Sequence, residues 1–281
     1  GLVNPLAQLA EVCQSRGVGL LVDARGTLGA LRIHADALGL TALVGASGAC
    51  LEGPPGLGFV ICRQDALAKL TPPRGPLSLD LRAQAARFAL DGEWRFTAPV
   101  ALLLGLDRAL DLLIEEGGPA GRRARYAENH AVLVEGMQAL GFMFAPSTDL
   151  EAPFAATFRA PSGDSWEFSR FRLALRTHRF SICPGPTPSP DTFRVGCIGQ
   201  VYPLDMEGCV GAVADVASLM GLFALAASHP SADASPDFGP RTRAVTQFSR
   251  IASPPLSPLQ VLESLSAPPE YVAWGEAQVA R

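Results

Sequence analysis

Three short apolar runs in the first quarter of the chain constrain its fold more than any other feature. They are VGLLVDA (18–24), TALVGAS (41–47) and LGFVICR (57–63), separated by polar or helical segments. Runs that are apolar throughout are typical of strands in a sheet that is covered on both faces. We therefore expect an α/β fold with a mainly parallel sheet, although three strands are too few for an independent doubly wound sheet.

The rest of the chain changes pattern twice. Residues 5–15 and about 100–140 place apolar residues three and four apart, as helices do. After Gly141 the order becomes strand, helix, strand, strand, helix, which is typical of a small α+β domain that ends in a helix over 204–223. From 226 onward the chain is rich in Ser, Pro and Ala, which predicts a disordered tail. The expected parts are 1–118 (large domain), 119–225 (small domain) and 226–281 (tail).

Composition excludes several classes of partner. The net charge is −4 and no basic patch is visible, so nucleic acid and anionic membrane surfaces are poor partners. No apolar run approaches the ~20 residues of a bilayer span, and we expect a cytoplasmic protein. The six cysteines are scattered without metal-binding spacing, which predicts reduced thiols and no metal site. Among 23 basic residues, Lys69 is the one lysine.

Several motifs follow one another in the order and spacing of a known enzyme family. They are GLVNPL, LLVDARGTLGAL, CLEGPPGLGFVICRQDAL, PLSLDL, DGEWRFTAP, YAENHAVLVEGMQALGF and TFRVGCIG. From residue 1 to about 223 the chain resembles 2-aminoethylphosphonate–pyruvate transaminase, a class V aminotransferase of fold type I that uses pyridoxal 5'-phosphate (PLP). The resemblance implies an incomplete large domain, an intact small domain and a homodimer. It also implies amino transfer from 2-aminoethylphosphonate to pyruvate, which gives phosphonoacetaldehyde and alanine.

The resemblance gives roles to two residues. Asp23 in LLVDA corresponds to the aspartate that pairs with the pyridinium nitrogen of PLP, and a carboxylate at a strand end can keep that nitrogen protonated. The alternative for Asp23 is a cap of the following turn. Arg194 in TFRVGCIG corresponds to the arginine that binds the acidic group of the substrate through its planar fork of donors. Its alternative is a solvated strand arginine, while Glu52 and Gly53 are expected to shape a turn.

The resemblance breaks at the catalytic lysine. In the family this Schiff-base lysine immediately precedes the cysteine of CLEG and also moves a proton, but here the position holds Ala49, after Gly48. Lys69 lies in the helical segment RQDALAKL, too far along the chain for its side chain to reach the end of the strand 41–47. We therefore predict no catalytic residue, and no covalent attachment of PLP at Ala49.

Other departures point in the same direction. The family sequence FTPPTH is FTAPVA here, so the threonine that helps to hold the cofactor phosphate across the dimer is Val100, and a lysine often found after YPG is Pro186. We expect the loop that cradles the phosphate to lie outside this match. Several changes together favour natural loss of catalysis over an engineered substitution. The prediction is a catalytically dead or truncated transaminase, and the alternative is a non-catalytic dimerisation or regulatory protein with the same fold.

Two rival chemistries use the same stretch. GASGA (45–49) is close to the G-x-S-x-G nucleophile elbow, but that elbow requires a helix directly after the serine, and CLEGPPG follows here. None of the four histidines lies in a loop that would make it the base of a hydrolase; they are His34, His130, His178 and His229. Cys50 has no basic neighbour in the sequence to lower its pKa, so we expect a buried apolar side chain.

Overall fold

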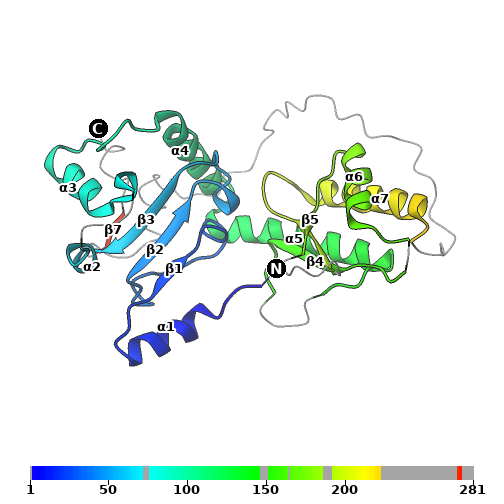
Figure 1. Cartoon of the computed structure of the whole chain (residues 1–281), viewed down its shortest axis with the longest axis horizontal. Helices are drawn as coiled ribbons and strands as arrows, with labels where there is room; N and C mark the ends of the chain where they lie inside the picture. The colour runs from blue at the N-terminus through cyan, green and yellow to red at the C-terminus, as the bar shows by residue number, and fades with distance from the viewer. Residues whose placement is uncertain are drawn as a thin grey trace.

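Two separate sheets organise this chain, and the long helix α5 (Gly118–Ala139) runs from one toward the other (Figure 1). The computed structural model describes residues 2–71, 76–145, 151–163, 165–185, 192–222 and 271–273. The first sheet has the strand order β1-β2-β3-β7 and the second has the order β4-β6-β5. Each sheet has its own cluster of buried apolar side chains.

The first sheet contains the three predicted strands. They are β1 (Leu21–Asp23), β2 (Ala42–Ala46) and β3 (Gly58–Arg63), followed at the edge by β7 (Tyr271–Ala273). β1 and β2 are parallel as predicted, whereas β3 runs antiparallel to β2 and β7 antiparallel to β3. A parallel third strand would need a crossover of a dozen or more residues, usually a helix. The connection from Ala46 to Gly58 holds only a short 3-10 turn, so the chain reverses direction.

Four helices accompany this sheet: α1 (Leu6–Ser15), α2 (Gln64–Ala68), α3 (Leu81–Asp91) and α4 (Val100–Glu115). α4 buries Leu110 and Leu113 against the sheet, beside Leu43 of β2 and Ile61 of β3. α3 was not predicted from the sequence. Its N-cap is Asp80, whose carboxylate accepts a hydrogen bond from the Ala83 amide at 3.0 Å, and none of the side chains of α3 is buried.

The second sheet matches the predicted α+β pattern. Its strands are β4 (Ala155–Arg159), β5 (Cys183–Pro184) and β6 (Thr192–Gly196), all antiparallel, and it is accompanied by α5, α6 (Phe168–Thr177) and α7 (Pro203–Met220). α7 begins with a proline, and the carboxylate of Asp205 accepts a hydrogen bond from the Tyr202 amide at 2.8 Å. The core is aromatic, with Phe158, Phe171 and Phe193 fully buried.

The predicted tail, 226–281, lies outside the described residues except for β7. Those three residues pair with β3, and the disorder expected for the tail stays a prediction. The predicted boundary between residues 118 and 119 falls at the start of α5, and the division into domains stays a prediction. None of the helices in the described ranges is both long enough and apolar enough to span a membrane.

Candidate functional site

The turn that follows β2 carries the position expected for the catalytic lysine. After Ala46 the chain enters the 3-10 turn η1 (Ala49–Leu51), and both Ala49 (φ 48°) and Glu52 (φ 59°) adopt left-handed backbone conformations. Such conformations cost roughly 1–3 kcal/mol each for residues other than glycine, so the surrounding structure has to impose them.

Ser47 imposes much of this geometry. Its fully buried hydroxyl donates to the carbonyl of Pro54 at 2.5 Å, and its own carbonyl accepts from the Gly53 amide at 2.8 Å. A Cβ at Gly53 would lie 2.7 Å from that carbonyl, and one at Gly45 would lie 2.3 Å from the Phe59 ring. These small residues therefore make room for the protein itself, and the buried Ser47 is no exposed nucleophile.

The positions that directly follow Ser47 have space for a side chain. Ala49 is exposed, and a Cβ built at the neighbouring Gly48 would meet no other atom closer than 4.0 Å. The position is therefore accessible, and hydrogen bonds of Ser47 hold the turn around it, yet the side chain is only a methyl group. No proton acceptor or nucleophile is present on this side chain.

Lys69 lies at the opposite end of the strands. The pairing of β2 with β3 places Ala46 beside Gly58 and Ala42 beside Cys62, so α2 and Lys69 follow the end of β3 that adjoins the start of β2 (Figure 1). The five residues of β2 span roughly 16 Å, which is more than a lysine side chain can reach. The Lys69 ammonium is 3.3 Å from the carboxylate of Asp65, and its side chain is 77% exposed.

Asp23 ends β1, beside Val44 of β2, as predicted for a residue at the carboxyl edge of parallel strands. Its carboxylate is held by Arg25, whose Nε and Nη2 donate to it at 2.9 and 2.6 Å. These hydrogen bonds lower the pKa of Asp23 to about 2, so the carboxylate is charged at neutral pH. Both side chains are more than half exposed.

Arg194 lies in β6, opposite Thr157 of β4 and Cys183 of β5. Its neighbours Phe193 and Val195 are buried, and Arg194 itself is on the other face of the sheet and half-buried. Its Nε donates to the Pro184 carbonyl at 3.3 Å. The two predicted site residues therefore have separate neighbours, Asp23 at the first sheet and Arg194 at the second.

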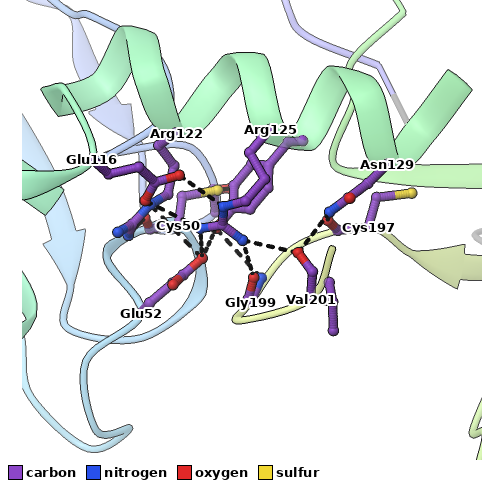
Figure 2. A network of polar contacts seen from close by, with 11 residues as sticks. Cys50, Glu52, Glu116, Arg122, Arg125, Asn129, Cys197, Gly199 and Val201 are labelled. Atoms are coloured by element: carbon purple, nitrogen blue, oxygen red, sulfur yellow. Dashed lines mark hydrogen bonds and ion pairs between the residues drawn. The ribbon is translucent and has the colours of Figure 1, made fainter. Parts of the chain in front are cut away.

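A buried polar cluster, which the sequence analysis missed, lies directly beside the 49–52 turn (Figure 2). We call it the Arg125 cluster; it consists of Glu52, Glu116, Arg122, Arg125, Tyr126 and Asn129. Arg125 donates to Glu52 at 2.8 Å and to Glu116 at 2.7 Å, and Arg122 donates to Glu116 at 2.7 Å. Glu52 and Arg122 are 4% and 1% exposed, and two charges of each sign balance within the cluster. Glu52 therefore does more than shape the turn.

Within the Arg125 cluster, hydrogen bonds between opposite charges offset the cost of burying those charges. Burial disfavours the charge on Arg125, but hydrogen bonds to Glu116 and Glu52 outweigh burial and raise its pKa. Burial also opposes the charge on Glu116, and hydrogen bonds from Arg125 and Arg122 lower its pKa nonetheless. Burial and a hydrogen bond to Glu52 together raise the pKa of Tyr126. Arg125 and Glu116 therefore stay charged near neutral pH, and the hydroxyl of Tyr126 stays protonated.

The thiol of Cys50 is inert, as predicted. It is fully buried beside the cluster and donates to the carbonyl of Gly26, and burial raises its pKa to about 12. The buried Cys197 has a pKa raised to about 12 for the same reason. Neither thiol forms a reactive thiolate under physiological conditions.

Comparison with known proteins settles the family. The aminotransferase class-V family model matches residues 1–171. The 2-aminoethylphosphonate–pyruvate transaminase of Paraburkholderia phymatum is 44% identical over 222 residues, which are 79% of this chain and 60% of that protein. The same enzyme of Burkholderia ambifaria is 43% identical over 234 residues, 83% of this chain and 62% of its own length. This chain belongs to the class V aminotransferases.

Solved structures of aminotransferases share the fold. Pyridoxamine–pyruvate aminotransferase from Mesorhizobium loti superimposes with a TM-score of 0.69 at 25% identity, over 79% of this chain and 57% of that one. Alanine–glyoxylate aminotransferase from Nostoc sp. gives 0.68 at 25% identity, over 77% and 58%. The predicted α/β fold of type I is thereby confirmed. The chain spans about 60% of the length of the first two relatives.

The residues of this class V aminotransferase fit the family cofactor only in part. The charged carboxylate of Asp23 suits a protonated ring nitrogen, although Arg25 already occupies it. The turn at Ala49 is exposed but offers no primary amine. Val100, at the start of α4, is 58% exposed and offers no hydroxyl, and Pro186 lies outside the described residues. Non-covalent binding is compatible with these groups and covalent binding is not.

Proposed function

We propose that this chain descends from a 2-aminoethylphosphonate–pyruvate transaminase and that it has lost catalysis. PLP, when bound to such an enzyme, supplies an electron sink for moving an amino group from the donor to pyruvate. In this chain Asp23 would pair with the ring nitrogen, and Arg194 would bind the acidic group of the amino donor. The observation that carries the proposal is Ala49, which is exposed in the turn after β2, where the resemblance places the catalytic lysine.

A second candidate is a non-catalytic dimerisation or regulatory protein. Residues 76–104 favour it, because this region leaves many large apolar side chains exposed to solvent. They are Leu77, Leu79, Leu90, Phe96, Val100 and Leu104, each more than half exposed. Exposed apolar surface of this kind is typical of protein–protein contacts, and a second copy of the chain is the partner that the family resemblance suggests.

Restoring the amine tests the first proposal. We expect Ala49→Lys, incubated with PLP, reduced with borohydride and mapped by mass spectrometry, to carry a pyridoxyl group at position 49. The unchanged chain should carry none, because Lys69 lies at the other end of the strands. Ala49→Arg is the matched control, since it adds a long cation without a primary amine.

Two results would contradict the proposal. One is a pyridoxyl group on Lys69, and the other is steady alanine formation by the unchanged chain at a rate above that of free PLP. An Ala49→Lys chain that takes up no pyridoxyl group, together with self-association of the unchanged chain, would favour the second candidate.

A further inference from the structure

We infer that Arg125 is a positioning residue that ties the turn 49–52 to the segment 197–201, so that the two hold one fixed arrangement. These segments are far apart in sequence and follow strands of different sheets, β2 and β6. They meet at one face of α5, where the guanidinium of Arg125 lies between them (Figure 2).

Arg125 bonds to both segments at once. Its Nη2 donates to the carboxylate of Glu52 at 2.8 Å on one side. Its Nη1 donates to the carbonyls of Gly199 and Val201 at 2.6 and 3.1 Å on the other. Its Nε is held by Glu116 at 2.7 Å, and the Tyr202 ring lies 5.2 Å from the guanidinium carbon. The planar guanidinium fixes the directions of all these bonds.

Neighbouring side chains on the same helical face bond to one or both of the two segments. Arg122 donates to the carbonyl of Cys50 at 2.9 Å, and Asn129 donates to the carbonyls of Cys197 and Val201 at 3.2 and 2.9 Å. Tyr126 contacts both segments, because its hydroxyl donates to Glu52 and accepts from the Gly199 amide at 3.4 Å. The positions 122, 125, 126 and 129 follow the spacing of one helical face.

The consequence concerns the geometry of the candidate site. Ala49 directly precedes Cys50, whose carbonyl is bound by Arg122, and Arg194 lies in β6, which leads directly into Cys197. The side chains on this face of α5 therefore fix where Ala49, at the expected lysine position, lies relative to β6, the strand that carries Arg194. Buried charges need their partners, so the arrangement has few alternatives of similar energy. The inference holds whether or not the chain binds PLP.

Hydrogen exchange measured on the full chain by mass spectrometry tests the inference. In Arg125→Gln we expect exchange about tenfold faster, both at the amides of 51–53 and at those of 199–201, with little change in the β4–β6 ladder. Arg125→Lys keeps the charge but loses the fork, so it should show the same paired increase to a smaller extent. Arg123→Gln is the matched control, because Arg123 is exposed on the other face of α5 and should change neither segment.

A second variant distinguishes coupling between the two segments from a purely local loss of hydrogen bonds. Within the described structure Glu52 bonds to side chains of α5 and not to the segment 197–201, yet Glu52→Gln should also accelerate exchange at 199–201. Faster exchange at 51–53 alone would overturn the inference. An equal rise throughout the second sheet in Arg125→Gln would also overturn it, since that pattern belongs to general destabilisation. If Arg125→Gln does not fold, Arg125→Lys and Glu52→Gln decide the question.

Discussion

The regions around the two sheets differ in how completely their apolar side chains are buried. Around the second sheet the aromatic side chains of Phe158, Phe171 and Phe193 are fully buried. Around the first sheet no side chain of α3 is buried, and Leu21 of β1 is 70% exposed. Since burial of apolar area is the main favourable contribution to folding, the second region contributes more stability per residue than the first. A chain can thus keep a folded site while part of its apolar surface faces water.

The largest effect that tests this contrast comes from the core of the second sheet. Phe193 contacts Phe142, Phe158, Trp166 and Phe171, with ring centroids 5.6–5.7 Å apart. We expect Phe193→Ala to lower the free energy of unfolding by about 3–5 kcal/mol, because a cavity replaces a well-packed ring. Urea denaturation followed by near-ultraviolet circular dichroism measures the change.

Phe96 provides the comparison in the first region. It is 54% exposed, with the guanidinium of Arg95 5.2 Å from its ring. Phe96→Ala should lower the free energy of unfolding by less than about 1 kcal/mol. Equal losses in Phe96→Ala and Phe193→Ala would show that the first region is packed as fully as the second, and the contrast would then be wrong.

Sequence reasoning predicted the parts of the fold that depend on local pattern. The strands around Val22, Leu43 and Ile61 came from apolar runs, and α7 from helical spacing. The antiparallel direction of β3 was not predicted, because an apolar pattern indicates that a segment is a strand but not whether it runs parallel or antiparallel to its neighbour. α3 was missed because its exposed, mixed face gives no clear apolar stripe.

The candidate site divides in the same way. Ala49 and Asp23 were found because a motif places them, and the position of Lys69 at the far end of the strands agrees with the sequence argument. The Arg125 cluster was not found, because Glu52 and Gly199 come near α5 only through the tertiary fold. One signal was present: the polar residues of RRARYAEN recur at the spacing of one helical face.

A smaller effect concerns His130, which is buried beside Phe144 and 3.3 Å from the carboxylate of Glu151. Burial lowers its pKa in spite of the attraction of Glu151, so the folded state resists protonation where the unfolded state accepts it. Stability contributed by neutral His130 is therefore complete above the ordinary pKa of 6.5 and falls as the pH drops below it. The loss is at most about 1.4 kcal/mol per pH unit.

His130→Gln should remove this dependence. We expect the melting temperature of the unchanged chain to fall from pH 7 to pH 5 more steeply than that of His130→Gln. His178→Gln is the matched control, because His178 is exposed at the end of α6 and should leave the slope unchanged. A slope identical in all three chains would show that burial of His130 does not control the acid response.

The smallest effect on stability, and the one nearest to the site, belongs to Arg25. Because the folded pKa of Asp23 is lowered to about 2, any stability from the pair is present above the ordinary pKa of 3.8 and is lost as the pH falls toward 2. Both side chains are exposed, so Arg25→Gln should scarcely change the free energy of unfolding. It should instead move the pKa of Asp23 up toward 3.8, as carboxyl NMR would record.

Without Arg25 the carboxylate of Asp23 is free of its partner, so Arg25→Gln should also raise the affinity of the chain for PLP. Arg63→Gln is the control: it breaks the similar exposed pair with Asp65 and should leave the affinity for PLP unchanged. Unchanged PLP affinity in Arg25→Gln would mean that Asp23 does not contact the cofactor, and the contrast between an exposed, adjustable site and its buried support would lose its functional meaning.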